Sequence, residues 1–177
     1  MLSSLTLIII NLSLIIMIDY TKYSDIVYKI IGASMAVHSE LRWGLLEPIY
    51  QEALHLELSD RGIENQREQE ITIQYKHHIL EKKYKMDIVV GDIVVELKSV
   101  AQLSAAHRAQ LCNYLRLTRM PVGLLINFGE KDLMAERWVY DEKSNECFLV
   151  DRRMRPIDVE YKELLDREAM DGEGTIQ

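Results

Sequence analysis

The sequence predicts an α/β fold in a single domain. Two helical segments come first along the chain, strand-like segments follow them, and a further helix separates these from a last buried strand. The 177 residues contain no internal repeat and no long linker, which is enough chain for one domain with a sizeable core. We therefore expect helices and strands to share one hydrophobic core.

The first two elements are helices, expected over about residues 23–41 and 45–61. Apolar residues recur in both segments at three- and four-residue spacing, which is the period of an amphipathic helix. Pro48 is tolerated only in the first turn of a helix, so the second helix should begin near Leu46 or Glu47.

The middle of the chain changes to the period of two that is typical of strands. Residues 70–75 alternate, Lys76-His77-His78 can form a turn, and residues 79–84 can return as a second strand. A hairpin follows, because the Ile- and Val-rich runs 86–90 and 93–98 flank two turn formers, Gly91 and Asp92.

The last elements are a helix and a buried strand, followed by weaker segments. Ser104 is a capping residue for a helix over about residues 105–118. The apolar run 123–129 has glycine at both ends, which favours a buried strand. The weaker candidates are strands over residues 138–140 and 147–150, a charged helix over residues 158–170 and a loose tail over residues 171–177.

The pairing expected within the hairpin brings two carboxylates together. With Gly91-Asp92 as the loop, Asp87 lies opposite Glu96 in a non-hydrogen-bonded pair, where side chains approach most closely. Like charges at that spacing destabilise a sheet unless a cation lies between them. Lys98, two residues past Glu96, points to the same strand face. The pattern predicts a metal site with an amine beside it.

A basic strip lies next to this hairpin in a chain whose net charge is -7. Residues 61–119 hold ten basic and seven acidic residues, a local balance of +3, so this part of the chain can face an anion. Within it, Tyr75 and Tyr84 stand beside lysines that can track a phosphate backbone. The same strip can instead be a charged edge strand that is protected against aggregation. Its lysines are Lys76, Lys82, Lys83 and Lys85.

The chain has two cysteines, Cys112 and Cys147. Two cysteines argue against a disulfide framework and against a cysteine-rich zinc site. We expect both residues in the core, and a reducing, cytoplasmic compartment for the protein.

The apolar N-terminus, residues 2–17, has several interpretations. It is short for a membrane span, and it has no basic residue before Lys22, which makes it a poor signal peptide. Translation can start at Met17 instead, so that residues 1–16 are an upstream artefact or a disordered extension. A membrane anchor or signal is the next interpretation, less favoured than an artefact or extension, and a packed helix is the last.

Several blocks in this order resemble the GxxExxY family, a branch of the PD-(D/E)XK nuclease superfamily. The naming motif is Gly44-Leu45-Leu46-Glu47-Pro48-Ile49-Tyr50, and the resemblance covers about residues 26–140. Met86 rather than proline precedes Asp87, which leaves the metal-binding acid in place. Further matching blocks are Val95-Glu96-Leu97-Lys98, the helix from Gln110 to Tyr114 and the strand from Gly123 to Gly129.

This resemblance implies a restriction-endonuclease-like fold, in which helices flank a mixed central β-sheet. The domain would span residues 18–157, between an apolar extension, 1–17, and a charged helix and tail, 158–177. The resemblance also implies nucleic acid as the partner, DNA rather than RNA. A nuclease of this size without an obvious recognition domain needs help to choose its target, from a second copy in a homodimer or from another protein.

The resemblance also implies a set of catalytic residues. Asp87 and Glu96, together with the Leu97 carbonyl, would ligate Mg²⁺ or Mn²⁺ through hard oxygen donors. Lys98 would orient or deprotonate a metal-bound water and stabilise charge on the phosphate. Glu47 would hold a metal-bound water or a second ion, and Gln110 would position the phosphate or the attacking water.

The same residues also have plain structural interpretations. Asp87 and Glu96 can join lysines in an ion-pair cluster on a solvated strand face. Glu47 is favoured in a first helical turn by the helix dipole alone. Gln110 shares a helix face with polar neighbours, and His38 lies near an apolar stripe as a core histidine does. The two functions to compare are therefore a metal-dependent nuclease and a non-catalytic nucleic-acid or protein interaction module that retains the fold.

Overall fold

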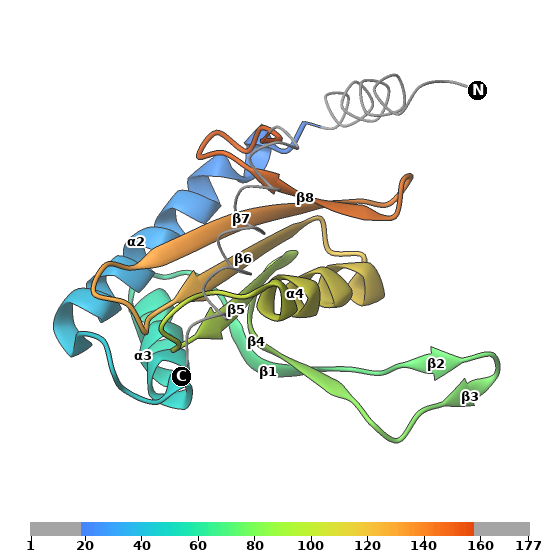
Figure 1. Cartoon of the computed structure of the whole chain (residues 1–177), viewed down its shortest axis with the longest axis horizontal. Coiled ribbons are helices and arrows are strands. Elements are labelled where there is room, and N and C mark those ends of the chain that lie inside the picture. Colours follow the sequence, from blue (N-terminus) through green and yellow to red (C-terminus); the bar gives the residue numbers. More distant parts are fainter. Residues whose placement is uncertain (1–18, 158–177) are drawn as a thin grey trace, which may run out of the picture.

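The structure is a computed structural model that describes residues 19–157 (Figure 1). The expectations for residues 1–17 and 158–177 lie outside the described residues. The helical elements are η1 (Thr21–Tyr23), α2 (Ser24–Leu41), α3 (Glu47–Asp60) and α4 (Ala105–Thr118). The strands are β1 (Gln66–Ile71), β2 (Gln74–Tyr75), β3 (His78–Ile79), β4 (Tyr84–Val90), β5 (Ile93–Lys98), β6 (Val122–Asn127), β7 (Met134–Asp141) and β8 (Glu146–Val150).

The main sheet has six strands in the order β1-β4-β5-β6-β7-β8. Strands β5 and β6 are parallel, and the other neighbouring strands are antiparallel. Helix α4 connects β5 to β6, because parallel neighbours need a crossover rather than a tight turn. The predicted mixed sheet flanked by helices is confirmed.

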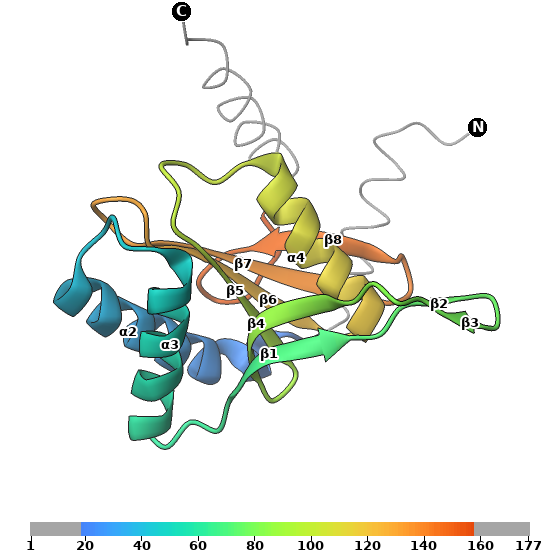
Figure 2. The ribbon, with the colours of Figure 1, turned by 90° about the horizontal axis from the view of Figure 1, so that it is seen from below.

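Helices cover both faces of the sheet (Figure 2). Helices α2 and α3 pack on one face, where Ile30 and Leu54 meet Val95 in the first core cluster. Helix α4 packs on the other face, where Leu111 and Leu115 belong to the second cluster. Cys112 and Cys147 are both buried in that second cluster, as predicted. Within residues 19–157, no helix is long and apolar enough to cross a membrane.

The hairpin of β4 and β5 has the predicted turn and register. Gly91 has a φ of 59°, which explains a glycine at this position of the two-residue loop. Val90 pairs with Ile93, and the ladder continues to Ile88 and Val95, but Asp87 and Glu96 do not form the next rung. The expectation that these two acids face each other as a regular cross-strand pair is therefore wrong.

The reason is a break in side-chain alternation at Asp87. A regular strand puts residues two apart on the same face, yet Met86 packs in the second core cluster and Ile88 in the first. On the neighbouring strand β1, Glu68 has a φ of 50°, and no pair forms between Glu68 and Asp87. The irregular backbone frees the Asp87 side chain from the two-residue period of the strand.

The segment before this hairpin differs most from the prediction. Residues 70–75 were expected as one strand, but β1 ends at Ile71 and a separate two-stranded arm, β2 and β3, follows. The strand expected over residues 79–84 is also wrong, because the chain leaves β3 after Ile79 and joins β4 only at Tyr84. The first part of β1 is polar, Gln66 to Glu70, so it carries no apolar alternation that a sequence pattern could detect.

Candidate active site

The Gly44-to-Tyr50 motif forms a loop that is fastened at the start of α3. Gly44 has a φ of 97°, a backbone conformation that favours glycine. The Tyr50 hydroxyl donates a hydrogen bond to the Arg42 carbonyl at 2.6 Å and accepts one from the Leu45 N–H at 3.1 Å. The Tyr50 ring stacks on Phe128 with 4.7 Å between centroids. The motif residues thus give this loop one defined shape.

The fastened loop places Glu47 beside strand β5. The Ser99 hydroxyl donates a 2.6 Å hydrogen bond to the Leu45 carbonyl, which ties the loop to the residue that follows Lys98. Glu47 is the first residue of α3, as Pro48 predicted. Its carboxylate lies 3.8 Å from the Lys98 ammonium.

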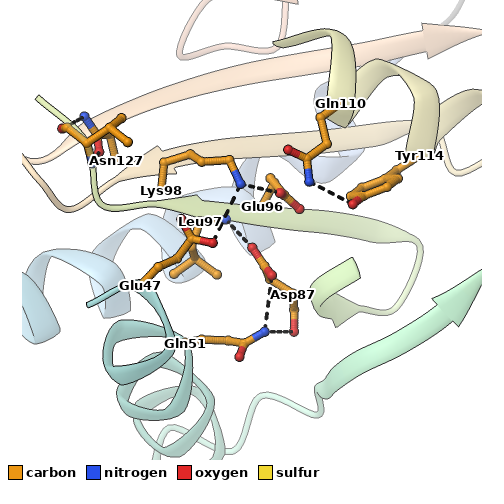
Figure 3. Close-up of polar contacts among 10 residues, drawn as sticks. Glu47, Gln51, Asp87, Glu96, Leu97, Lys98, Gln110, Tyr114 and Asn127 are labelled. Carbon is orange, nitrogen blue, oxygen red and sulfur yellow. Dashed lines mark hydrogen bonds and ion pairs between the residues drawn. The ribbon is translucent and has the colours of Figure 1, made fainter. Parts of the chain in front are cut away.

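Asp87 is held by backbone and side-chain partners on both sides (Figure 3). Its Oδ2 accepts a hydrogen bond from the Leu97 N–H at 2.8 Å, in place of a regular ladder contact. Gln51 of α3 donates from Nε2 to the Asp87 carbonyl at 3.2 Å and to its Oδ1 at 3.3 Å. Sequence reasoning missed Gln51, although it lies one helical turn after Glu47 and therefore on the same face of α3.

Glu96 and Lys98 form a buried ion pair on the α4 side of β5. The Lys98 Nζ lies 2.6 Å from Glu96 Oε1, and only 1% of Glu96 is exposed. The other Glu96 oxygen, Oε2, is buried without a hydrogen-bond partner among the described residues. Burial and the nearby Asp87 carboxylate raise the pKa of Glu96 to about 8. A buried carboxylate oxygen without a partner is costly, so its retention calls for a functional reason.

The pKa values of Asp87 and Lys98 are also raised, like that of Glu96. Burial raises the pKa of Asp87, although the hydrogen bond from Leu97 and the charge of Lys98 oppose this. Burial lowers the pKa of Lys98, but Glu96, Glu47 and Asp87 together leave it above its ordinary value. The lysine is therefore held as a cation beside these three acidic side chains.

Helix α4 brings a second group of polar side chains toward the acids. Gln110 donates from Nε2 to the Tyr114 hydroxyl at 2.8 Å rather than to the Glu96 carboxyl. Burial and the charges of Glu96 and Asp87 raise the pKa of Tyr114. His107 accepts a hydrogen bond from the Ser104 N–H at Nδ1, and burial and Lys98 lower its pKa. Figure 3 shows Gln110 and Tyr114 across β5 from Glu47.

Asn127 is another residue that sequence reasoning missed. It lies at the end of β6, opposite Lys98 in the parallel register, and is fully buried. Its amide donates to the Val100 carbonyl and to Glu130, and its oxygen accepts from the N–H groups of Val100 and Gly129. Asn127 thereby fixes the chain that leaves β5 after Lys98. The sequence signal that could have identified it is a polar residue, Asn127, at the end of the apolar run 122–126.

The predicted basic strip runs from the arm to the start of β4. Lys76 lies between β2 and β3, the two strands of the arm that projects from the sheet (Figure 1), and Lys82 and Lys83 lie between β3 and β4. Lys76 is at the arm's turn, with its ammonium 5.5 Å from the Tyr75 ring centroid. Lys83 forms a 2.6 Å ion pair with Glu70, which is also the cross-strand partner of Lys85. The four lysines therefore line the arm and its root.

His38 is a structural histidine. Only 8% of it is exposed, its Nε2 hydrogen-bonds to the Glu130 carbonyl at 2.9 Å, and its ring lies 6.1 Å from that of Phe128. These contacts agree with the core interpretation of the sequence pattern.

The donor set fits a hard divalent cation. Asp87 and Glu96 supply carboxylate oxygens, the Leu97 carbonyl lies between Glu96 and Lys98 in sequence, and Glu96 Oε2 is without a partner. Among residues 19–157 there is no group of three or more His, Cys, Asp or Glu side chains that could hold a metal ion on their own. Any ion bound here would therefore rely on backbone oxygen and water to complete its coordination, as Mg²⁺ usually does.

The fold and the buried acids and lysine together define a restriction-endonuclease-like α/β domain. The family model described as the PD-(D/E)XK nuclease superfamily matches residues 24–138, and the chain therefore belongs to that superfamily. Among solved structures, the crystal structure of SSO0001 is similar with a TM-score of 0.42 and 18% identity, over 72% of this chain and 59% of that one. This chain thus spans less than two thirds of that protein's length. No curated protein gives a significant match.

Proposed function

We propose that this protein is a metal-dependent nuclease of the GxxExxY branch that hydrolyses phosphodiester bonds in nucleic acid, DNA rather than RNA. The observation that carries the proposal is the buried Glu96 oxygen without a hydrogen-bond partner among the described residues, next to a lysine whose pKa the surrounding acidic side chains raise. A purely structural cluster gains nothing from such an oxygen, whereas a site for Mg²⁺ or Mn²⁺ needs one.

Each residue of the cluster has a part in this reaction. A divalent ion, when bound, supplies Lewis acidity toward the phosphate and lowers the pKa of a bound water. Asp87, Glu96 and the Leu97 carbonyl hold the ion. Lys98 stabilises negative charge that develops on the phosphate, because its ammonium is fixed by Glu96.

Glu47 and Gln110 act from the two helices that border the site. Glu47 is partly exposed and lies 3.8 Å from Lys98, so it can accept a hydrogen bond from the attacking water. Gln110 positions the phosphate after its amide leaves the Tyr114 hydroxyl. Lys76, Lys82, Lys83 and Lys85 contact the nucleic-acid backbone along the arm.

The test is cleavage of single- and double-stranded DNA and RNA with Mg²⁺ or Mn²⁺, compared between the wild-type chain and Lys98→Ala and Asp87→Ala. Both variants should lose at least 100-fold in rate while circular dichroism shows a folded protein. Lys29→Ala, an exposed lysine of α2, is the matched control and should keep wild-type activity. Cleavage that persists unchanged in Lys98→Ala would sink the proposal.

A non-catalytic interaction module that retains the fold is the second candidate. The observation that favours it is the raised pKa of Glu96, about 8, because a neutral Glu96 at pH 7 lets the cluster persist without a cation. Under this alternative, Asp87→Ala binds nucleic acid or a protein partner as the wild type does, and no metal-dependent cleavage is found. We propose a cytoplasmic location for the protein and, for the nuclease, self-association or a second protein that chooses the target.

A further inference from the structure

Large apolar side chains are exposed to solvent in the short segment of chain that surrounds Glu47 in sequence. Trp43 is 44% exposed, Leu46 is 74% exposed and Ile49 is 45% exposed. Leu46 directly precedes Glu47, and Ile49 follows it by two residues. We refer to Trp43, Leu46 and Ile49 as the apolar rim. Exposed apolar side chains in one short segment mark a binding surface more often than scattered single ones do.

The rim is held in place although it does not fill the core. Three hydrogen bonds fasten the loop that carries it: Tyr50 to Arg42, Leu45 to Tyr50, and Ser99 to Leu45. The last of these joins the loop to the residue after Lys98, so the loop that carries the rim has a fixed place beside the end of β5. A loop whose only task was to connect α2 to α3 would not need this fastening, because connecting loops tolerate mobility.

The charge at the rim suits an anionic chain with aromatic bases. The Arg42 guanidinium lies over the Trp43 ring, 5.4 Å from its centroid, and Glu47, paired with Lys98, is the one acid in residues 42–49. Arginine beside an exposed indole is a common arrangement for contacting a phosphate and stacking on the adjacent base.

We propose that the apolar rim binds the bases of an unpaired strand next to the phosphate in the site, so that the substrate is single-stranded or has a melted end. An intact duplex presents sugar and phosphate to a side chain beside the scissile bond, and apolar side chains cannot hydrogen-bond to these groups. The faces of unpaired bases are apolar and aromatic, and they complement the rim. This inference rests on the proposed function, since it places the scissile phosphate beside Lys98.

The experiment is binding of the full chain to a fluorescent single-stranded 20-mer and to the blunt duplex of the same sequence, in EDTA so that no cleavage intervenes. The wild type should bind the single strand more tightly than the duplex. Trp43→Ala should weaken single-strand binding by about 5- to 150-fold, which corresponds to the loss of one stacked base, and Trp43→Phe should retain most of it. Tyr28→Ala is the matched control and should bind as the wild type does. Tyr28 is 80% exposed and lies about 20 Å along α2 from the helix end that leads to the rim.

Intrinsic fluorescence gives a second readout. The chain has two tryptophans, and the other, Trp138, is buried and hydrogen-bonded to Glu136. A single strand should quench the emission of Trp43 in the wild type and leave that of Trp43→Phe unchanged.

The outcomes separate this inference from the proposed function. Equal single-strand affinity of Trp43→Ala and wild type, or tighter binding of the duplex by wild type, overturns the inference even if the protein cleaves nucleic acid. A loss of self-association in Trp43→Ala with strand binding unchanged also overturns it, since the rim then binds a second copy. If strand binding depends on Trp43 but no nucleic acid is cleaved, the result supports base binding by the rim and refutes the proposed nuclease activity.

Discussion

The replacement of Glu96 by glutamine tests the energetic basis of the site without any knowledge of its substrate. Glutamine has nearly the shape of glutamate and can still accept the hydrogen bond from Lys98, but it carries no charge. Because burial and Asp87 raise the pKa of Glu96 to about 8, the folded wild-type protein holds this carboxyl protonated at neutral pH. We therefore expect Glu96→Gln to be more stable than the wild type.

The size of the gain depends on pH. Below pH 4.5 the carboxyl is protonated in both the folded and the unfolded chain, and it contributes no pH dependence. Between pH 4.5 and about 8 the unfolded chain releases the proton while folded Glu96 keeps it, so the free energy of unfolding of the wild type falls as pH rises. At about 1.4 kcal/mol per pH unit, the variant should gain about 3 kcal/mol at pH 7 and about 5 kcal/mol above pH 8.

The assay is urea or thermal unfolding of both proteins between pH 5 and 9. For a chain of this size, about 3 kcal/mol corresponds to a rise in Tm of roughly 6–12 °C. Glu52→Gln, which removes an exposed glutamate from α3, controls for the loss of one negative charge. A stability difference between Glu96→Gln and wild type that stays constant across this range would refute the reasoning, because a fixed difference reports packing rather than ionisation.

The remaining predictions concern the metal, the motif loop, the buried amide and the arm. Mg²⁺ or Mn²⁺ at about ten times its dissociation constant should raise the wild-type Tm by roughly 3–6 °C at pH 8. EDTA should remove this rise in Tm, and Glu96→Gln should show no rise with the metal. Tyr50→Phe should lose about 1–3 kcal/mol in urea unfolding, because the Arg42 carbonyl and the Leu45 N–H lose their partner, and protease should then cut residues 42–46 faster. Asn127→Ala should lose about 2–4 kcal/mol in the same assay. Combined alanines at Lys76, Lys82 and Lys83 should reduce by about 2 the slope of log affinity against log salt for a single strand.

The helices and the central hairpin could be predicted because their signals are local. Pro48 placed the start of α3, and Ser104 placed the start of α4, within a residue of the structure. The Gly91-Asp92 turn determined the register of β4 and β5 as far as Ile88. In each case a single residue restricts the backbone, so the pattern needs no knowledge of the rest of the fold.

The arm and the irregular backbone at Asp87 could not be predicted in the same way. The first part of β1 is polar, and its pairing with β4 is decided by contacts between segments distant in sequence. Pairing arithmetic assumes a regular ladder, and nothing in the residues around Asp87 shows that alternation breaks there. Gln51 and Asn127 were missed because each acts on the site through a neighbour: Gln51 holds Asp87, and Asn127 holds the chain after Lys98.

The irregular backbone explains how the two acids coexist. In a regular ladder, the Asp87 and Glu96 carboxylates would lie directly opposite each other without a hydrogen-bond donor for either one. The repulsion between them would destabilise the sheet. In the structure, Asp87 instead accepts a hydrogen bond from the Leu97 N–H and receives the Gln51 amide, so its charge has fixed partners. Glu96 has Lys98 at one oxygen and no hydrogen-bond partner among the described residues at the other. Burial and Asp87 therefore disfavour the charged form of Glu96, a cation bound at Oε2 would relieve this, and the pH dependence of the stability difference between Glu96→Gln and the wild type reports it.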